Sequence, residues 1–359
     1  MFDTRDGTGG RLGALGAGDS WEFTFAGQFG IPPGTVAIAI NLTSVDATAP
    51  TFVTAWPTGQ TRPFTANLNP VPGMAVPNLV VVGRLGSGGA LSLYNNSGSV
   101  HLVGDIVGYF DAASNVGLVA LTPARLLDTR DGTGASAPAP IGEAKHIDLQ
   151  VAGRGGVPDN VAAVALNVTV TEPTMGSYLT VYPAGETRPL AASVNMVRGQ
   201  TVPNMVFARV KNGQVSIYNN SGSTHVVADV LGCFTDGAAG KYVAMTPARV
   251  LDTREGLGAP QARVGQAPVE LALGGVAGIP ASGVSAALLN VTCVSPSAGT
   301  YITVYPTGGD RPLAANLNAV AGQIVPNMVI GRLGPDGKVA IFNYAGDVDL
   351  VADVMGYFK

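Results

Sequence analysis

With 359 residues, the chain is long enough for two or three ordinary domains, each able to bury its own core. Only 12% of its residues are charged, against roughly a quarter in an average soluble protein, and its net charge is −4 without any basic cluster. This composition excludes an electrostatic surface for nucleic acid. The sequence has no apolar run of about 18 residues, so we also expect no membrane-spanning helix.

The same pattern occurs three times along the chain, at a spacing of about 124 residues. The recurring positions include the Asp-Thr-Arg tripeptides at 3–5, 128–130 and 252–254, the Asn-x-Thr tripeptides at 41–43, 167–169 and 290–292, and the Pro-Asn pairs at 77–78, 203–204 and 326–327. A unit of this length is a domain. We therefore predict three domains, at 1–112, 117–236 and 241–359. The first copy lacks the lead-in strand that precedes the Asp-Thr-Arg tripeptide in the other two copies. We therefore expect the chain to be a fragment of a longer protein or a mature form.

Short strands account for most of each copy. In the second copy they are expected at 145–151, 161–170, 177–182, 203–210, 214–218 and 224–234. Several of these segments alternate with period two, and turn-forming residues separate them. The pattern predicts an all-β protein of three tandem β-sandwich domains, jelly-roll-like in type. Short connectors indicate that neighbouring copies touch, but they leave open whether the copies form a rod or pack about a pseudo-threefold axis.

A loop rich in carboxylates and glycines opens each copy. Its acidic residues are Asp3 and Asp6, Asp128 and Asp131, and Asp252 and Glu255. Oxygen ligands on a tight loop suit Ca²⁺, and these residues are therefore candidate calcium ligands. The spacing is not that of an EF-hand, and the alternative interpretation is ordinary turn chemistry.

A carboxylate interrupts the last apolar strand of each copy, at Asp105, Asp229 and Asp353. A buried carboxylate is costly unless it is paired, and we predict pairing with Arg5, Arg130 and Arg254. His101 and His225 lie four residues before the aspartate, and Asp349 takes that position in the third copy. A catalytic triad is not expected, because residues i and i+4 of one strand stand about 13 Å apart.

An aromatic residue followed by proline ends one strand in each copy, and an Arg-Pro pair comes soon after. These candidate ligand-binding residues are Trp56 and Arg62, Tyr182 and Arg188, and Tyr305 and Arg311. Such a ring can stack on a sugar while the arginine binds hydroxyl groups. The alternative is a buried ring at a strand end, with the arginine bonded to loop carbonyls.

Two further residue sets have structural interpretations. The sequon residues Asn41, Asn167 and Asn290 lie in mid-strand, so we expect amides bonded within their own sheet instead of glycosylated ones. Cys233 and Cys293 do not recur between copies, and two buried free thiols are expected.

Three strings give the chain a family resemblance: Thr-Pro-Ala-Arg-Leu-Leu-Asp-Thr-Arg at 122–130, Tyr-Leu-Thr-Val-Tyr-Pro at 178–183 and Val-Val-Ala-Asp-Val-Leu-Gly at 226–232. They resemble a largely uncharacterised repeat of secreted and cell-surface proteins of actinobacteria. The resemblance implies an extracellular or cell-surface location and no known catalytic residues.

From these observations the sequence predicts a non-catalytic extracellular module that binds glycan or cell-wall polymer through repeated sites. No cofactor beyond Ca²⁺ is indicated. The alternative is a structural protein that self-associates into a surface layer, filament or spike, because low charge and threefold repetition also suit lateral packing.

Overall fold

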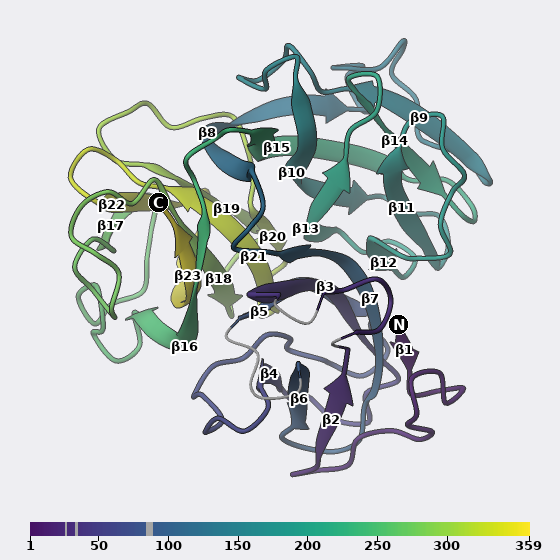
Figure 1. Ribbon diagram of the computed structural model, residues 1–359, viewed down its shortest axis with the longest axis horizontal. Coiled ribbons are helices and arrows are strands. Elements are labelled where there is room, and N and C mark those ends of the chain that lie inside the picture. The colour runs from purple at the N-terminus through teal and green to yellow at the C-terminus, as the bar shows by residue number, and fades with distance from the viewer. Residues whose placement is uncertain (26, 33–34, 84–88) are drawn as a thin grey trace.

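The computed structural model describes residues 1–25, 27–32, 35–83 and 89–359, and these contain strands and no helix. They form six antiparallel sheets, arranged in pairs as three lobes around a common centre (Figure 1). The all-β prediction is confirmed. Within the described ranges, no helix is long and apolar enough to cross a membrane.

Lobe two shows the complete topology. Its strands are β8 (Val116–Asp128), β9 (Lys145–Gln150), β10 (Val161–Thr171), β11 (Ser177–Pro183), β12 (Val194–Met196), β13 (Val202–Arg209), β14 (Gln214–Asn219) and β15 (His225–Asp236). One sheet has the order β8-β15-β10-β13 and the other β9-β14-β11-β12. Numbered from the start of the lobe, the first sheet holds strands one, eight, three and six. This is the strand order of a jelly roll.

Lobe three has the same topology. Its strands are β16 (Tyr242–Asp252), β17 (Val269–Ala272), β18 (Ala286–Val294), β19 (Thr300–Pro306), β20 (Leu317–Ala319), β21 (Ile324–Arg332), β22 (Lys338–Asn343) and β23 (Asp349–Phe358). Its sheets are ordered β16-β23-β18-β21 and β17-β22-β19-β20.

Lobe one has a shorter first strand than the other two lobes. Its strands are β1 (Phe2–Asp3), β2 (Ser20–Thr24), β3 (Ala37–Val45), β4 (Val53–Pro57), β5 (Val76–Gly83), β6 (Ala90–Asn95) and β7 (His101–Phe110). The sheets are β1-β7-β3-β5 and β2-β6-β4, and a single bridge from Val53 to Leu68 takes the place of the fifth strand. The short β1 pairs with only two residues of β7, Gly104 and Val103.

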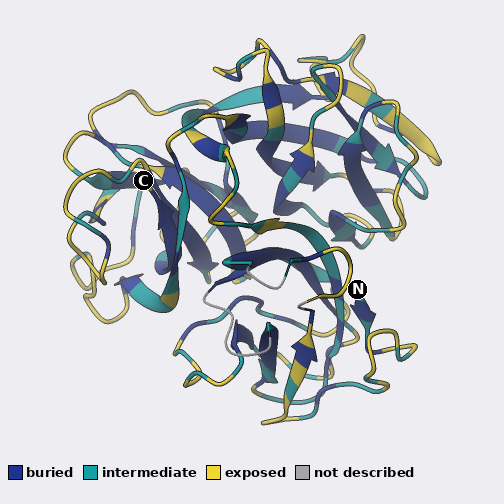
Figure 2. Ribbon diagram, viewed as in Figure 1, coloured by how far each residue is buried: buried dark blue, intermediate teal, exposed yellow. Residues whose placement is uncertain are grey.

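In the sheet that holds strands one, eight, three and six, the third strand of each lobe (β3, β10 and β18) is buried on both faces over most of its length, whereas the first strands and β7 are partly exposed. In β10, Val164 and Leu166 point into the sandwich of lobe two, whereas Ala165 belongs to a cluster shared with the other lobes. The outer sheet differs, because in β9 buried Leu149 alternates with exposed neighbours. Figure 2 shows β3 and β5 near the centre as mostly buried and β9 at the rim with exposed residues.

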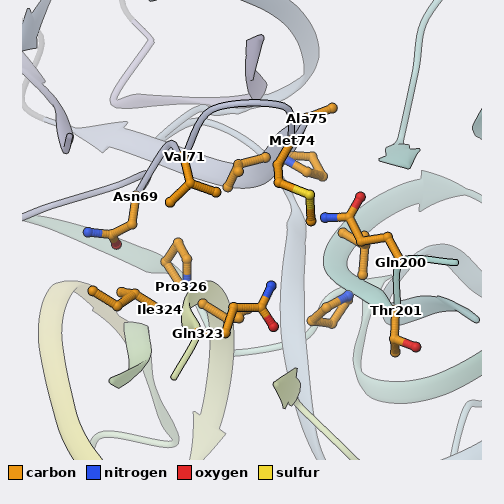
Figure 3. Close-up of a pocket in the computed structure, with 14 residues that line it drawn as sticks. Asn69, Val71, Met74, Ala75, Gln200, Thr201, Gln323, Ile324 and Pro326 are labelled. Carbon is orange, nitrogen blue, oxygen red and sulfur yellow. The ribbon is translucent and has the colours of Figure 1, made fainter. Parts of the chain in front are cut away.

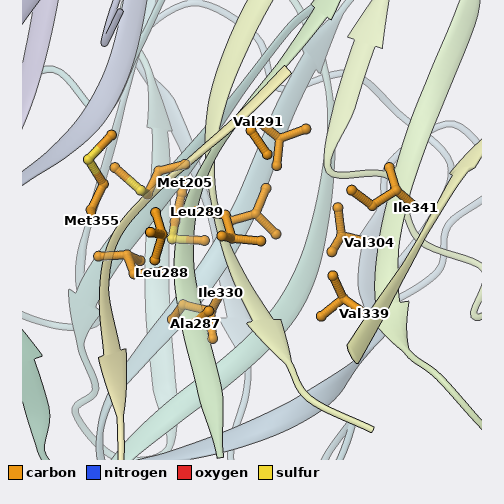
Figure 4. Packing of buried hydrophobic residues seen from close by; sticks show 14 of the residues in the cluster. Met205, Ala287, Leu288, Leu289, Val291, Val304, Ile330, Val339, Ile341 and Met355 are labelled. Atoms are coloured by element: carbon orange, nitrogen blue, oxygen red, sulfur yellow. The ribbon is translucent and has the colours of Figure 1, made fainter. Parts of the chain in front are cut away.

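The shared cluster extends from the core of lobe three into the space between the lobes, whereas lobes one and two each keep a core of their own. It includes Ala39 from lobe one, Met205 from lobe two and Leu288 from lobe three, all at most 1% exposed. Figure 4 shows Met205, Leu288 and Met355 close together in this region. Burial of apolar surface between lobes, at about 25 cal/mol per Å², therefore holds them as one body. The copies pack about a pseudo-threefold axis and not as a rod.

Candidate functional site

Six asparagines close a ring of hydrogen bonds around this axis. In each lobe one asparagine donates from Nδ2 to the Oδ1 atom of an asparagine in another lobe: Asn78 to Asn290 (2.8 Å), Asn204 to Asn41 (2.7 Å) and Asn327 to Asn167 (2.7 Å). The Oδ1 atoms of the three donors accept backbone N–H groups of Met328, Leu79 and Met205, again across lobes. Each lobe thus bonds to both of the others.

The sequon asparagines belong to this ring, whereas the sequence had indicated bonds within their own sheet. Asn41, Asn167 and Asn290 are at most 3% exposed, and their Nδ2 atoms donate to the carbonyls of Ala192, Ala315 and Ala66. Those carbonyls belong to other lobes, so the prediction of bonds within the same sheet was wrong. The amides stabilise contacts between lobes.

The buried carboxylates pair with a different arginine from the predicted one. Asp229 Oδ1 accepts a hydrogen bond from Arg125 Nε at 2.5 Å, and Asp353 Oδ1 accepts one from Arg249 Nε at 2.9 Å. A register shift in the pairing of β15 with β8 sets Arg125 opposite Asp229. The predicted pairing with Arg130 and Arg254 was wrong.

The three arginines of the Asp-Thr-Arg tripeptides bind the aspartate two residues before them. The closest contacts, from Arg5 to Asp3, Arg130 to Asp128 and Arg254 to Asp252, are all 2.6 Å. In lobe three, the Arg254 hydrogen bond holds the pKa of the Asp252 carboxyl below its ordinary value. The predicted pair of Arg5 and Asp105 is likewise replaced by the local pair of Arg5 and Asp3.

The buried carboxylates also accept hydrogen bonds from the backbone of a neighbouring lobe. Asp105 accepts the Ala192 N–H at 3.3 Å, Asp229 accepts the Ala315 N–H at 3.1 Å, and Asp353 accepts that of Ala66. Burial raises the pKa of the Asp229 carboxyl, while Arg125 opposes that shift. These side chains therefore join lobes.

The candidate calcium loops are turns stabilised by their own side chains. Asp131 Oδ1 accepts the Thr133 N–H at 2.8 Å, and Asp6 Oδ1 accepts that of Thr8 at 2.9 Å. Gly134 has a φ of 70°, and a Cβ at this position would collide with the Leu126 carbonyl oxygen. The described residues contain no group of three or more His, Cys, Asp or Glu side chains placed to hold a metal. The calcium site stays a prediction.

His101 and His225 each contact the threonine of an Asp-Thr-Arg tripeptide. His225 Nδ1 lies 3.0 Å from Thr129 Oγ1, and His101 Nδ1 lies at the same distance from Thr4 Oγ1. In lobe three, Thr253 Oγ1 donates to Asp349 Oδ1 at 3.2 Å. The hydroxyl of the Asp-Thr-Arg tripeptide thus has a side-chain partner in every lobe.

Both cysteines are buried and free, as predicted. Burial raises the pKa of the Cys233 thiol to about 11 and that of Cys293 to about 12. Neither thiol is a reactive nucleophile at neutral pH.

The aromatic residues at the strand ends do not form exposed platforms. Trp56, Tyr182 and Tyr305 are 7 to 8% exposed. The arginines lie over other rings, with Arg62 3.5 Å from the centre of Tyr94, Arg188 4.1 Å from Tyr218 and Arg311 3.8 Å from Phe342. The cation–π contacts fix the loop that follows each strand.

The tip of this loop carries an apolar side chain that sequence reasoning missed. Two residues after the arginine come Phe64, Leu190 and Leu313, which are 91%, 93% and 80% exposed. Two residues further on, the alanine carbonyl of the same loop binds another lobe. Each apolar side chain is thus held outward on a loop fixed on both sides. The triple occurrence of Arg-Pro followed by Phe or Leu was the available signal.

A small cavity lies on the pseudo-threefold axis, between loops of all three lobes. Figure 3 shows Met74, Gln200 and Gln323, one from each lobe, around a cavity of about 30 Å³. Beside it, between lobes two and three, lies a larger pocket of about 440 Å³ that includes Arg198, Thr201 and Asn318 in its wall. The Asn318 Oδ1 atom is buried and has no hydrogen-bond partner among the described residues.

Comparisons with known proteins give no family. No protein-family model and no curated protein matches the chain. Among solved structures it is similar to one described as "The Triple Jelly Roll Fold and Turret Assembly in an Archaeal Virus", at 4% identity and a TM-score of 0.22, covering 96% of this chain and 83% of that one. Another is described as "Life in the extremes: atomic structure of Sulfolobus Turreted Icosahedral Virus", at 6% identity and a TM-score of 0.20, covering 96% and 84%. The assignment as a jelly roll rests on the strand order of this chain itself.

Proposed function

We propose that the chain is a non-catalytic structural module that self-associates outside the cell, in a surface layer or filament. The observation that carries this proposal is the threefold set of apolar loop tips, Phe64, Leu190 and Leu313. A single exposed apolar side chain is ordinary on a protein surface, but the same position is apolar in all three lobes.

The loops that hold these side chains suit a binding role. Arginine stacking fixes one side of each loop, and a hydrogen bond to another lobe fixes the other. A side chain held in its bound position loses little conformational entropy on association. Burying one Leu or Phe contributes roughly 1.5 to 3 kcal/mol, so three contacts on one rigid body support a stable assembly.

Light scattering at rising protein concentration tests this function. We expect the unchanged chain to form large particles and the triple variant Phe64→Ser, Leu190→Ser, Leu313→Ser to stay at the mass of one chain. A matched control replaces Leu12, Met175 and Leu257, which are exposed but not equivalent between lobes. A single-chain mass for the unchanged protein at all concentrations would refute the proposal.

Binding of glycan or cell-wall polymer is the second candidate, and the pocket between lobes two and three favours it. A volume of about 440 Å³ accommodates a sugar unit, and Arg198, Thr201 and Asn318 offer both donors and acceptors. On a glycan array we expect saturable binding that Thr201→Val and Arg198→Ala weaken. Binding that survives both changes would place the glycan elsewhere, and an empty array would leave self-association as the function.

A further inference from the structure

The pocket between lobes two and three contains an arginine that has no partner within the protein. Arg198 is exposed and lies in the wall of this pocket. In the described parts of the chain, every other arginine has a hydrogen bond, an ion pair or a ring contact, as Arg209 has with Glu186 and Arg188 with the Tyr218 ring. Arg198 has none of these among the described residues. Its guanidinium is therefore available to a ligand.

The repeat shows that the turn around Arg198 does not require an arginine. A backbone hydrogen bond closes the same turn in each lobe, from Met74 to Val71, from Gln200 to Val197 and from Gln323 to Val320. The residue at the Arg198 position is Pro72 in lobe one and Ala321 in lobe three. The next residue is a glycine with positive φ in each lobe, at 73° for Gly199. Because one turn forms with three different side chains, Arg198 is not needed to shape it.

Two side-chain amides add uncharged donors to the same wall. Gln200 Oε1 accepts the Val197 N–H at 3.0 Å, and Gln323 Oε1 accepts the Val320 N–H at 3.1 Å. These bonds fix which end of each amide is the oxygen, and they leave Nε2 without an acceptor among the described residues. Figure 3 shows both amides directed towards the space between the loops. The wall thus presents N–H groups from lobe two and from lobe three.

No acidic side chain balances the charge of the arginine. The described residues that line this pocket include neither Asp nor Glu. The chain as a whole has 24 acidic and 20 basic residues, so the pocket is a local positive site on a negative protein. Guanidinium and amide N–H groups form strong hydrogen bonds to carboxylate and other anionic oxygens. A neutral sugar in this pocket would leave the charge of Arg198 unused.

We propose that the pocket between lobes two and three binds an acidic sugar, with the sugar carboxylate paired to Arg198 and its other oxygens bonded to the amides of Gln200 and Gln323. This inference rests on the second candidate function, glycan binding at this pocket, and names the class of sugar. One carboxylate balances one arginine, and a planar guanidinium donates two parallel hydrogen bonds to it. A volume of about 440 Å³ accommodates the sugar ring together with its carboxylate.

Calorimetric titration of the full chain with short oligomers of galacturonate, glucuronate and mannuronate tests the inference. The methyl esters of the same oligomers are the matched ligands, because esterification removes the charge and keeps the sugar ring. We expect at least one acidic oligomer to bind about tenfold or more tightly than its ester, since hydrogen bonds to charged groups are stronger than neutral ones. This preference should decrease with added salt, which screens the exposed guanidinium.

Variants of the arginine connect the preference to the pocket. Arg198→Ala should lower the affinity for the acidic oligomer to that of its ester, and Arg198→Lys should keep part of the difference because the charge remains. Arg209→Ala removes an arginine that is not in the pocket wall and is the matched control. A preference that Arg198→Ala leaves intact would overturn the inference.

The remaining outcomes separate this inference from the function on which it rests. Equal affinity for acid and ester, or binding of neutral sugars alone on the glycan array, would overturn the acidic specificity and leave glycan binding in place. An empty array together with no binding of any oligomer at millimolar concentration would refute glycan binding, and the inference with it.

Discussion

Asn204 donates from Nδ2 to Asn41 Oδ1 over 2.7 Å, although the two residues are 163 positions apart. The same Nδ2 also donates to the Ser193 carbonyl at 2.7 Å, and Oδ1 accepts the Leu79 N–H at 2.9 Å. One fully buried amide thus joins the backbones of two lobes. This contact occurs three times around the axis, and it bonds the three copies into one body.

Asn204→Ala should lower the free energy of unfolding by about 3 kcal/mol, because it leaves several buried donors and acceptors without partners. Chemical denaturation measures the loss. Asn96→Ala removes an exposed asparagine and is the control. A loss no larger than that of the control would show that the ring adds nothing to stability.

Arg125→Ala should cost about 3 to 5 kcal/mol, because it leaves the Asp229 carboxylate buried and unpaired. Arg130→Ala should cost less than about 1 kcal/mol, since the Arg130 side chain is 49% exposed. A double-mutant cycle of Arg125 and Asp229, measured by thermal unfolding, should show strong coupling. Equal losses for the two arginines would contradict the assigned pairs.

Acid should destabilise lobe three through Asp252. The Arg254 hydrogen bond lowers the pKa of Asp252 in the folded state below the unfolded value of about 3.9. As pH falls, the unfolded state binds the proton first, so this stabilisation is present above the unfolded pKa and is lost as pH falls through the folded pKa. The difference in melting temperature between the unchanged chain and Asp252→Asn should therefore shrink from pH 6 towards about pH 3. A difference that stays constant would exclude this role.

The melting temperature should be the same in chelator and in millimolar Ca²⁺, because Asp128 and Asp131 already accept hydrogen bonds from their own loop. Differential scanning fluorimetry measures this directly. A rise in Ca²⁺ that Asp131→Asn abolishes would establish the calcium site instead.

Tyr182→Ala should cost about 3 to 5 kcal/mol, the range found for large buried aromatic residues. Tyr344→Ala, at a side chain 49% exposed, is the matched control and should change stability little. Denaturant unfolding distinguishes the two. A folded Tyr182→Ala variant with unchanged stability would contradict a core role for this ring and favour the alternative interpretation, a sugar-binding platform on the surface.

The sequence by itself determined the strands, the three copies and the jelly-roll type of fold. Alternation in 161–170 separates Val164 and Leu166 from Ala165 and Asn167, because successive side chains of a strand point to opposite faces. Turn formers between such segments leave few topologies other than a sandwich or a jelly roll.

Only the tertiary structure decided what covers each face and which charges meet. A period of two does not say whether the second face meets water or another lobe, so the role of Asn167 was misassigned. The choice between Arg125 and Arg130 depended on a register shift in β15, which shifts the pairing by one position and leaves no mark in the composition of the strand. The burial of Trp56, Tyr182 and Tyr305 and the exposure of Phe64, Leu190 and Leu313 were likewise decided by tertiary packing, which a period of two does not reveal.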